Sequence, residues 1–557
     1  MSQQVVTTGS RGNDAADGVR VTVVSTTHNP GPAFDDLVRS YEQQTLSTDQ
    51  FEVLFCDDGS DEATQQRLTD LERTHPNFRA IRLPHSGWPG GPRNAGVREA
   101  RGRYVYFCDD DDRLHPEALQ RLCDFADEHG SDVVVGMMVG VGRWLNMGTF
   151  RRTIPHAKLG VDPLLDFMTP HKLFRTDFIR SHGIEYPVGK VRLEDHQFVI
   201  QAYLEASTIS IYSDRPVYYW VVRKDRKSIS SSRIDPATYY RDLEQVLAIV
   251  ERRTNPSPFR HTLLAHWYRG KVLGRLGGER VAGYPPEHFD NLLAQARPLV
   301  GRWFPPEVDE FLPYPFRLRS ALLRADDREG LIAYAAIEGG LKCLAFASEI
   351  EWTADGQLRV VLTTSVRTAD NVPLRFEETV HDGTTRQVWR PPVAVSPDVL
   401  TDEVLDAAKD IEGDSIQFFV RDLVDQAIYP LSDQLPVTGA EFVLDPRTAL
   451  GGLPLRARAE LLLVIKRAGW TFRRRVRVRD DVFAPDARTR TTAHGRELGV
   501  RRLKDDNVLI VTSAPAKVAK RTPTPKTVPQ RVWAVVPAPG RRVVKGLRRR
   551  LRKAAQR

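Results

Sequence analysis

A short apolar run followed directly by four aspartates constrains the fold of this chain more than any other stretch. The apolar residues Tyr104–Phe107 are typical of a buried strand, and the acids are Asp109–Asp112. Pro116 then stands where the first turn of a helix tolerates proline, and apolar residues recur on one helical face as far as Ala126. Because ligand sites in open α/β sheets lie at the carboxyl ends of strands, we expect the aspartates to line such a site.

Four carboxylates packed beside a low-dielectric sheet repel one another. A hard divalent ion, Mg²⁺ or Mn²⁺, bound by one or two carboxylates together with substrate phosphates, would offset this repulsion. The alternative is a solvated acidic segment, but such a segment has no reason to lie between a buried strand and an amphipathic helix. The run therefore predicts a metal site.

Two earlier segments have the same order of strand, polar loop and helix. An apolar run from Val21 leads into the loop TTHNPG, and FEVLFC leads into DDGSDEAT, which begins at Asp57. A third unit begins with FRAIRLP. The repetition predicts a parallel, doubly wound sheet whose functional loops meet at one edge.

The 557 residues should form several domains. Helical periodicity with proline-rich turns begins near Asp235, and strands of period two follow beyond Ile332. The sequence thus predicts a multidomain chain of class α/β + α + β, in which the last part is a tandem of Ig-like β-sandwiches. The expected bounds are a disordered tail at 1–19, an α/β domain at 20–234, a helical linker at 235–330, β-sandwiches at 331–434 and 435–516, and a basic tail at 517–557.

The net charge of +8 lies in the C-terminal tail. Arg541–Arg557 holds nine Lys or Arg and no acid, so the first 540 residues carry 8 − 9 = −1. Apolar residues at helical spacing in this tail suit an anionic membrane surface; a solvated tail or non-specific nucleic-acid binding is the alternative, and we expect no specific nucleic-acid partner. The polar N-terminus and the lack of a long apolar stretch predict a cytoplasmic protein, peripheral on the inner face of the membrane.

Between about Val21 and Ser232 the motifs TTHNP, CDDGSD, GGPRNAG, FCDDDD, KLFRTDF and LEDHQF follow one another. This succession resembles the family 2 glycosyltransferases of the GT-A fold. The resemblance implies an inverting, metal-dependent enzyme that uses a UDP-sugar. The Asp-x-Asp motif of that family maps onto Asp109 and Asp111, which the resemblance implies as the ligands of Mn²⁺ or Mg²⁺, with Asp109 also at the ribose edge.

The resemblance also implies a nucleotide-sugar site in which an aspartate of Asp57–Asp58 accepts a hydrogen bond from the uracil ring; a simple Asp-Gly-Ser turn is the alternative. Arg93, in the glycine-rich loop, is a planar, permanently charged donor. A basic, hydroxyl-rich loop after Val222 is suited to close over a diphosphate, unless it is only a solvated connector. The expected nucleotide-sugar-binding residues are Thr27, His28, Pro30, Asp57, Asp58, Arg93, Asn94, Asp109, Asp110, Arg223, Ser228 and Ser230.

Glu194 and Asp195 open a predicted helix, where the helix dipole favours ionised acids. Simple N-terminal capping is the alternative. By the resemblance, Asp195 is the catalytic base that takes the proton of an acceptor hydroxyl as that oxygen attacks the anomeric carbon opposite the leaving diphosphate. Glu194 is then expected to orient the donor sugar or the acceptor.

The order of the domains resembles the wall teichoic acid glycosyltransferases that add N-acetylglucosamine to poly(ribitol phosphate), in which C-terminal β modules assemble a trimer. The resemblance implies an anionic glycopolymer as acceptor and a homotrimer. The Arg-rich segment TFRRRVRV and the basic tail would give the acceptor a positive track. The alternatives are a transferase for a capsular or other polysaccharide with a different UDP-sugar, and a catalytically silent carbohydrate-binding scaffold, which would not require Asp111 and Asp195.

Overall fold

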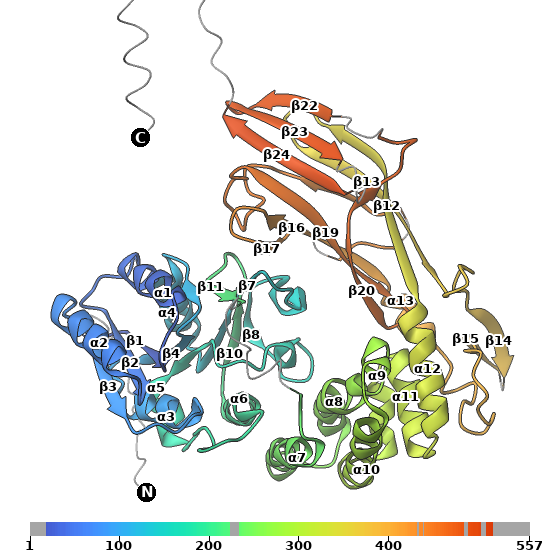
Figure 1. Ribbon diagram of the computed structural model, residues 1–557, viewed down its shortest axis with the longest axis horizontal. Coiled ribbons are helices and arrows are strands. Elements are labelled where there is room, and N and C mark those ends of the chain that lie inside the picture. Colours follow the sequence, from blue (N-terminus) through green and yellow to red (C-terminus); the bar gives the residue numbers. More distant parts are fainter. Residues whose placement is uncertain are drawn as a thin grey trace, which may run out of the picture. The chain divides into compact units, whose positions relative to one another are not determined.

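The computed structural model describes residues 18–222, 233–381, 383–431, 434–437, 439–483, 488–502 and 508–515 (Figure 1). The basic tail expected at 517–557, and all but the last residues of the tail expected at 1–19, lie outside these ranges. Within the described ranges no helix is long and apolar enough to cross a membrane.

A mixed eight-stranded sheet forms the centre of the N-terminal domain, in the order β3-β2-β1-β4-β9-β6-β10-β8. The strands β3, β2, β1 and β4 are parallel, as the repeated order of strand, loop and helix predicted. Beyond them β9 runs antiparallel to both β4 and β6. The strands are β1 (Val21–Thr27), β2 (Phe51–Asp58), β3 (Phe78–Leu83), β4 (Tyr104–Asp109), β6 (Val133–Gly136), β8 (Ile154–Ala157), β9 (Leu173–Arg175) and β10 (Ile209–Tyr212).

Amphipathic helices alternate with the parallel strands and cover the sheet (Figure 1). In α4, for example, the predicted apolar face is buried, and the helix ends at Gly130, whose left-handed backbone (φ 62°) suits glycine. The helices of this domain are α1 (Ala33–Glu42), α2 (Glu62–Thr74), α3 (Gly90–Glu99), α4 (Ala118–His129), α5 (Thr176–Ser181) and α6 (Glu194–Glu205).

A helical region follows, as predicted, and continues past the expected boundary at residue 330 to the end of its last helix. Proline stands in the first turn of four of its helices, where the missing backbone N–H costs no hydrogen bond. The helices are α7 (Pro236–Arg253), α8 (Pro258–Trp267), α9 (Glu279–Ala282), α10 (Pro286–Trp303), α11 (Tyr314–Arg324) and α12 (Arg328–Gly340).

The C-terminal part is rich in strands, which form a large sheet, a smaller sheet β18-β13-β12-β21 and the hairpin β14-β15. The path of the large sheet is β22-β23-β24-β19-β16-β17-β7-β11-β5, with β20 paired to β19. The elements of the whole C-terminal part are β12 (Lys342–Trp352), β13 (Leu358–Arg367), β14 (Glu377–His381), β15 (Thr384–Val388), α13 (Ala408–Glu412), β16 (Ser415–Asp422), β17 (Ala427–Pro430), β18 (Glu441–Leu444), β19 (Arg458–Arg467), β20 (Trp470–Arg475), β21 (Arg477–Val478), β22 (Arg488–Ala493), β23 (Arg496–Arg502) and β24 (Leu509–Pro515).

The predicted tandem of Ig-like sandwiches divided at residue 434 is not confirmed. β12 and β13 lie before that residue, yet they share a sheet with β18 and β21, which lie after it. The large sheet likewise joins β16 and β17 to β19 and β24. Alternation of apolar and polar residues identifies strands but does not say which strands pair, so the sequence could not reveal this interleaving.

The large sheet also extends into the N-terminal domain. β7 (Met138–Val141) pairs with β17 and with β11 (Tyr218–Val221), which in turn pairs with β5 (Arg113–Leu114). Because β5 directly follows the four aspartates, the C-terminal strands are connected through backbone hydrogen bonds to the segment that carries the candidate site.

Candidate active site

The polar residues of the site lie where β1, β2 and β4 end. In the pairing register Thr27 is opposite Asp57, and Thr26 is opposite Asp109. The three strands are parallel neighbours, so their carboxyl ends meet at one edge of the sheet. This is the edge at which the sequence placed the functional loops.

Arg93 of α3 connects the acids of this edge to the helix α6. Its guanidinium donates to Asp195 Oδ1 at 2.6 Å and to Asp109 Oδ1 at 3.0 Å, and Glu194 Oε1 lies 4.0 Å away. The side chain is only 4% exposed and lies over the ring of Tyr186, 5.3 Å from its centroid. The expected base Asp195 and the first aspartate of the acidic run are therefore held at two ends of one cation.

The charges in this cluster shift one another's protonation. Burial alone would lower the pKa of Arg93, but Asp195 and Asp109 raise it well above the ordinary value, so the guanidinium stays charged. Burial raises the pKa of Asp195, and Arg93 opposes that shift. For Glu194, burial and the neighbouring Asp195 raise the pKa to about 8.

The N-terminus of α6 is held in an unusual conformation by the helical region. Leu193, immediately before the Glu194–Asp195 pair, has a left-handed backbone with φ 61°, which is rare for a branched side chain. Asp242 of α7 accepts a hydrogen bond from the backbone N–H of Arg192 at 2.9 Å. One turn further on, Trp267 Nε1 of α8 donates to His196 Nδ1 at 3.1 Å. The linker thus fixes the helix that carries the expected base.

The four consecutive aspartates occupy different environments. Asp112 is 1% exposed, and its oxygens accept from the Tyr218 hydroxyl and from the Val221 backbone N–H. Asp110 is also buried and accepts from the backbone N–H of His28 at 3.4 Å. Asp112 therefore anchors β11 to the acidic loop, which leaves Asp109 and Asp111 as the partly exposed carboxylates.

Asp109 and Asp111 fit a hard divalent cation by the chemistry of their donors. Ligand atoms of Asp109, Asp112 and His171 lie within 4.8 Å of one another, although both Asp112 oxygens already have protein partners. Carboxylate oxygens, with a histidine nearby, are donors that Mg²⁺ and Mn²⁺ accept. This grouping contains one of the two predicted ligands, Asp109, together with Asp112 and His171, and does not contain Asp111. The pair Asp109 and Asp111 therefore stays a prediction, and His171 was not among the expected ligands.

The loops expected to bind the nucleotide base contain two buried polar atoms without a hydrogen-bond partner among the described residues. Asp58 accepts hydrogen bonds from the backbone N–H groups of Ser86 and Gly87, both at 2.8 Å, so its carboxylate fixes the glycine-rich loop. Asp57 Oδ2 accepts from the Ser60 N–H at 3.1 Å, whereas Asp57 Oδ1 is buried with no partner among the described residues. The buried Thr27 hydroxyl also has no such partner.

Three further expected residues take different positions around these loops. His28 stacks on His85 with ring centroids 4.3 Å apart, and Pro30 is partly buried beside it in the same loop. Asn94 has neither polar atom available to a ligand, because its amide donates to the Tyr186 carbonyl and accepts from the Tyr186 N–H, both at 2.8 Å. Asn94 therefore positions Tyr186 beneath Arg93.

One glycine of the glycine-rich motif GGPRNAG is needed for close packing of α3 against the sheet. In α3, a Cβ on Gly96 would lie 2.4 Å from a methyl group of Val24 in β1, so only glycine lets the helix approach the sheet at this point. Gly96 lies three residues after Arg93, so this close contact helps to place the guanidinium.

Arg223, Ser228 and Ser230 lie outside the described residues. Two buried residues that were not expected in the site stand close to it. His171 Nε2 is 3.7 Å from Asp109 Oδ2 and its ring stacks on Tyr218; burial lowers its pKa to about 4. Lys172 is fully buried, and burial, opposed by Asp195, lowers its pKa to about 7. The pair His171-Lys172 before an apolar strand was the only sequence signal.

Comparison with known families agrees with this geometry. Residues 22–181 match the family described as Glycosyl transferase family 2, and residues 236–335 match the Glycosyl transferase TarS linker domain. The N-terminal part of the chain is thus similar to family 2 glycosyltransferase domains, and the helical region that follows is similar to TarS linker domains.

The curated relatives include poly(ribitol-phosphate) glycosyltransferases. A poly(ribitol-phosphate) beta-glucosyltransferase of Bacillus spizizenii is 26% identical over 343 residues, which are 58% of this chain and 51% of the relative. The poly(ribitol-phosphate) beta-N-acetylglucosaminyltransferase TarS of Staphylococcus aureus is 32% identical over 224 residues, 40% of this chain and 39% of the relative. The matches thus span about half of these relatives or less.

Solved structures of S. aureus TarS have a similar fold. The structure of TarS 1-349 in complex with UDP-GlcNAc has a TM-score of 0.52 and 25% identity, and covers 61% of this chain and 96% of that one. The longer TarS structure has a TM-score of 0.50 at 18% identity and covers 90% of this chain and 86% of that one. The second likeness extends the similarity of fold, and only of fold, into the C-terminal strands.

Proposed function

We propose that this protein is an inverting glycosyltransferase that moves a sugar, N-acetylglucosamine foremost, from a UDP-sugar to a hydroxyl of a cell-envelope polymer such as poly(ribitol phosphate). The observation that carries the proposal is the single buried guanidinium of Arg93, which holds Asp195 next to Asp109 in a family 2 domain. A single displacement at the anomeric carbon requires a base for the acceptor hydroxyl and stabilisation of the leaving diphosphate, and Arg93 brings a candidate group for each close together.

In the proposed reaction Asp195 accepts the proton of the acceptor hydroxyl as that oxygen attacks the anomeric carbon and the bond to the diphosphate breaks. Burial raises the pKa of Asp195, which strengthens it as a base, while the ion pair with Arg93 favours the ionised form. Attack from the face opposite the leaving group inverts the anomeric centre. Glu194, beside the base, orients the sugar or the acceptor.

Asp109 and Asp111 would hold Mn²⁺ or Mg²⁺, which when bound supplies charge neutralisation for the departing diphosphate. His171 would restrain the Asp109 carboxylate, since its Nε2 lies 3.7 Å from Oδ2. At the loops expected to bind the uracil ring, the buried Asp57 Oδ1 has no hydrogen-bond partner among the described residues and is suited to accept from the ring N–H. Thr27, His28 and Pro30 lie next to it.

The choice of sugar has two candidates, because one relative is a glucosyltransferase and another an N-acetylglucosaminyltransferase. The decisive experiment measures UDP release from UDP-N-acetylglucosamine, UDP-glucose and UDP-galactose, with Mn²⁺, Mg²⁺ or EDTA, in the presence and absence of poly(ribitol phosphate). We expect release that depends on both metal and polymer, with one sugar preferred. Absence of polymer-stimulated release with every sugar would refute the function.

Two further assignments belong to the same proposal. The order of the domains, which resembles that of trimeric enzymes, is the ground for proposing a homotrimer through the C-terminal strands; light scattering would show three copies. The tail at 517–557, outside the described residues, would bind anionic membranes, and deleting it should abolish co-sedimentation with vesicles that contain phosphatidylglycerol.

A further inference from the structure

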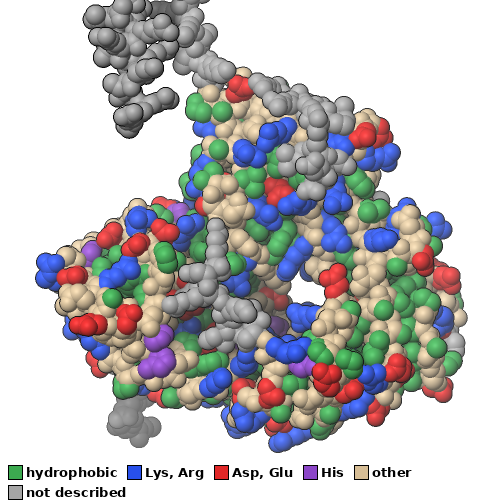
Figure 2. All heavy atoms as spheres, viewed as in Figure 1, with side chains coloured by type: hydrophobic (Ala, Val, Ile, Leu, Met, Phe, Trp, Pro, Cys, Tyr) green, Lys and Arg blue, Asp and Glu red, His purple; other side chains and the backbone are tan. Residues whose placement is uncertain are grey.

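A cavity of about 540 Å³ lies away from the acidic strand ends, where three parts of the chain meet. Loop residues 145–148 of the N-terminal domain line one side, the segment 310–317 of the helical region lines another, and strands β16, β19 and β20 line the third. In Figure 2 the molecule is hollowed between the N-terminal domain and the helical region, and Lys and Arg side chains lie at the upper edge of the hollow.

The wall formed by the strands is polar and basic. Lys466 of β19 is opposite Ser415 of β16 and Thr471 of β20, and two residues along, Val464 of β19 is opposite Arg473 of β20. Side chains two apart in a strand point to the same face, so these residues share one face, and all of them line the cavity. A face built only for packing against other domains would be apolar.

Two cations of this wall have no salt bridge with a described residue. The side chains of Lys466 and Arg473 make no hydrogen bond or ion pair with the described residues, although Arg473 lies over Trp144, 5.8 Å from its ring centroid, and the nearby Asp166 partly offsets the lowered pKa of Lys466. Burial lowers the pKa of both side chains. The Ser415 hydroxyl is buried and likewise has no partner within the described ranges.

The other charges of the cavity wall do not neutralise these two. Arg317 is paired with Asp410 at 3.2 Å, and Arg269 lies 3.8 Å from Asp166. In all, five Lys or Arg and three Asp or Glu side chains line the cavity, which gives a net charge of +2. Lys466 is half-buried and Arg473 is exposed, so the net positive charge of the wall is open to a ligand and favours an anion.

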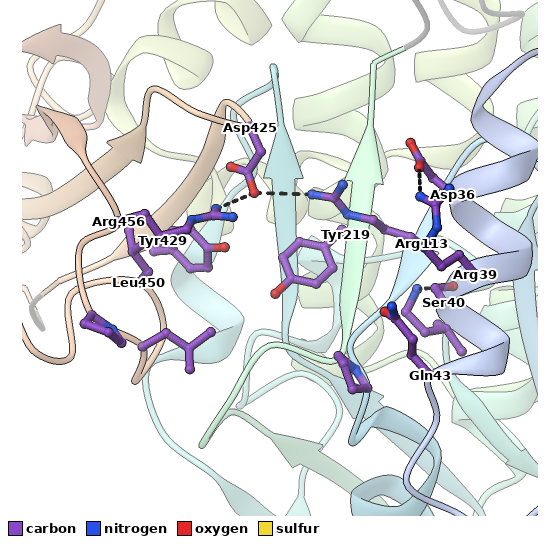
Figure 3. A pocket seen from close by; sticks show the side chains of 14 residues that line it. Asp36, Arg39, Ser40, Gln43, Arg113, Tyr219, Asp425, Tyr429, Leu450 and Arg456 are labelled. Carbon is purple, nitrogen blue, oxygen red and sulfur yellow. Dashed lines mark hydrogen bonds and ion pairs between the residues drawn. The ribbon is translucent and has the colours of Figure 1, made fainter.

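A second cavity, of about 470 Å³, shows the opposite arrangement (Figure 3). It also contains arginines, but Arg113 and Arg456 both contact Asp425, and Arg39 contacts Asp36. Its cations are already neutralised by the protein, so it gives no comparable reason to expect an anionic ligand.

We propose that the first cavity binds a segment of the phosphodiester-linked, hydroxyl-rich acceptor polymer, with a phosphate between Lys466 and Arg473 and polyol hydroxyls at Ser415 and Thr471. The volume exceeds what one phosphate ion needs, and the hydroxyl side chains beside the cations suit a polyol. This inference rests on the proposed function for the identity of the polymer. Binding at a second place on the chain would raise the local concentration of acceptor units near the transfer site.

The test measures binding of poly(ribitol phosphate) to the full chain by calorimetry, without any donor. The variant is the double substitution Lys466→Gln/Arg473→Gln, and the matched control is Lys158→Gln/Arg98→Gln, which removes the same charges at exposed positions. We expect the polymer Kd to rise about tenfold in the first variant and to stay unchanged in the control. The charge-preserving pair Lys466→Arg/Arg473→Lys should retain most of the affinity.

Equal polymer affinity in wild type and Lys466→Gln/Arg473→Gln would overturn the inference, as would binding of inorganic phosphate with no binding of the polymer. Transfer to a one-unit acceptor tests the proposed function separately, because a single unit cannot span both sites. If wild type binds polymer through Lys466 and Arg473 but transfers no sugar, the proposed function fails while the binding site stands.

Discussion

The candidate active site and the cavity lined by Lys466 and Arg473 both hold cations, but they balance charge in opposite ways. Arg93 is buried with carboxylates on both sides, and their field raises its pKa. Arg473 is exposed and has no salt bridge among the described residues. The first arrangement is balanced without a ligand and is suited to preorganise a reaction; the second leaves a positive charge open to a ligand. Whether a cation is ion-paired within the protein therefore distinguishes the proposed catalytic site from the proposed polymer-binding cavity.

The largest expected effect comes from removing the base. Asp195→Asn should lower the rate of transfer by about 10³-fold, within the range for general bases, and should leave UDP affinity nearly unchanged. Steady-state kinetics and UDP calorimetry provide the two readouts. The exposed Asp177→Asn on α5 is the matched control and should transfer at the normal rate. Normal turnover by Asp195→Asn would mean that another group takes the proton.

Loss of the central cation should destabilise the fold. Arg93→Met leaves the partly buried carboxylates of Asp195, Asp109 and Glu194 without their counter-charge, which should cost about 3 kcal/mol, the low end of the range for breaking a buried pair. Urea unfolding of the variant measures this cost. Arg98→Met, on the same helix but exposed, should change stability by less than about 0.5 kcal/mol. Similar losses in the two variants would show that the network contributes little.

Glu194 should make stability fall as pH rises. Its pKa in the folded protein is about 8, against an ordinary value of 4.5, so between these values the folded state holds a proton that the unfolded chain has released. Stability is thus lost as pH rises through that window. Glu194→Gln removes the effect and should stabilise the protein at pH 8 by on the order of 1 to 2 kcal/mol. Thermal unfolding at pH 5 and pH 8 measures it; parallel pH profiles for variant and wild type would contradict the shift.

The smallest expected effect is that of replacing Lys466, which should change the stability of the fold in the opposite direction to replacing Arg93. Because Lys466 has no salt bridge with a described residue and Asp166 offsets its burial only in part, Lys466→Met should leave stability unchanged or raise it by up to about 1 kcal/mol, while polymer affinity falls. Chemical unfolding without polymer gives the stability term. A loss of stability as large as that of Arg93→Met would show that Lys466 is a structural cation and would remove the contrast between the two regions.

Much of the active site was predictable from sequence, because its residues follow strands and open helices at positions where local pattern determines placement. Asp109, Arg93 and Asp195 meet as expected. The different environments of the four aspartates were not predictable from the sequence. The structural role of Asp112, for example, depends on a hydrogen bond from Tyr218, which lies 106 residues further along the chain. The role of Asn94 as a support for Tyr186 depends in the same way on tertiary contact.

The C-terminal part was less predictable for the same physical reason. The segment TFRRRVRV was expected to form one positive track, but its arginines diverge. Arg473 enters the cavity, Arg474 donates to the Cys343 carbonyl at 2.9 Å, and Arg475 pairs with Glu460 at 2.8 Å. Strand alternation sends neighbouring residues to opposite faces, so only the paired strands decide which arginine stays unpaired.

The hydrogen bonds from α7 and α8 to the start of α6 have a practical consequence for anyone who wishes to shorten the protein. A fragment cut after the sheet, near residue 234, would keep every motif yet lose Asp242 and Trp267 and, with them, the supports on either side of Asp195. The smallest fragment worth screening for inhibitors or crystals therefore runs to the end of α12 at Gly340.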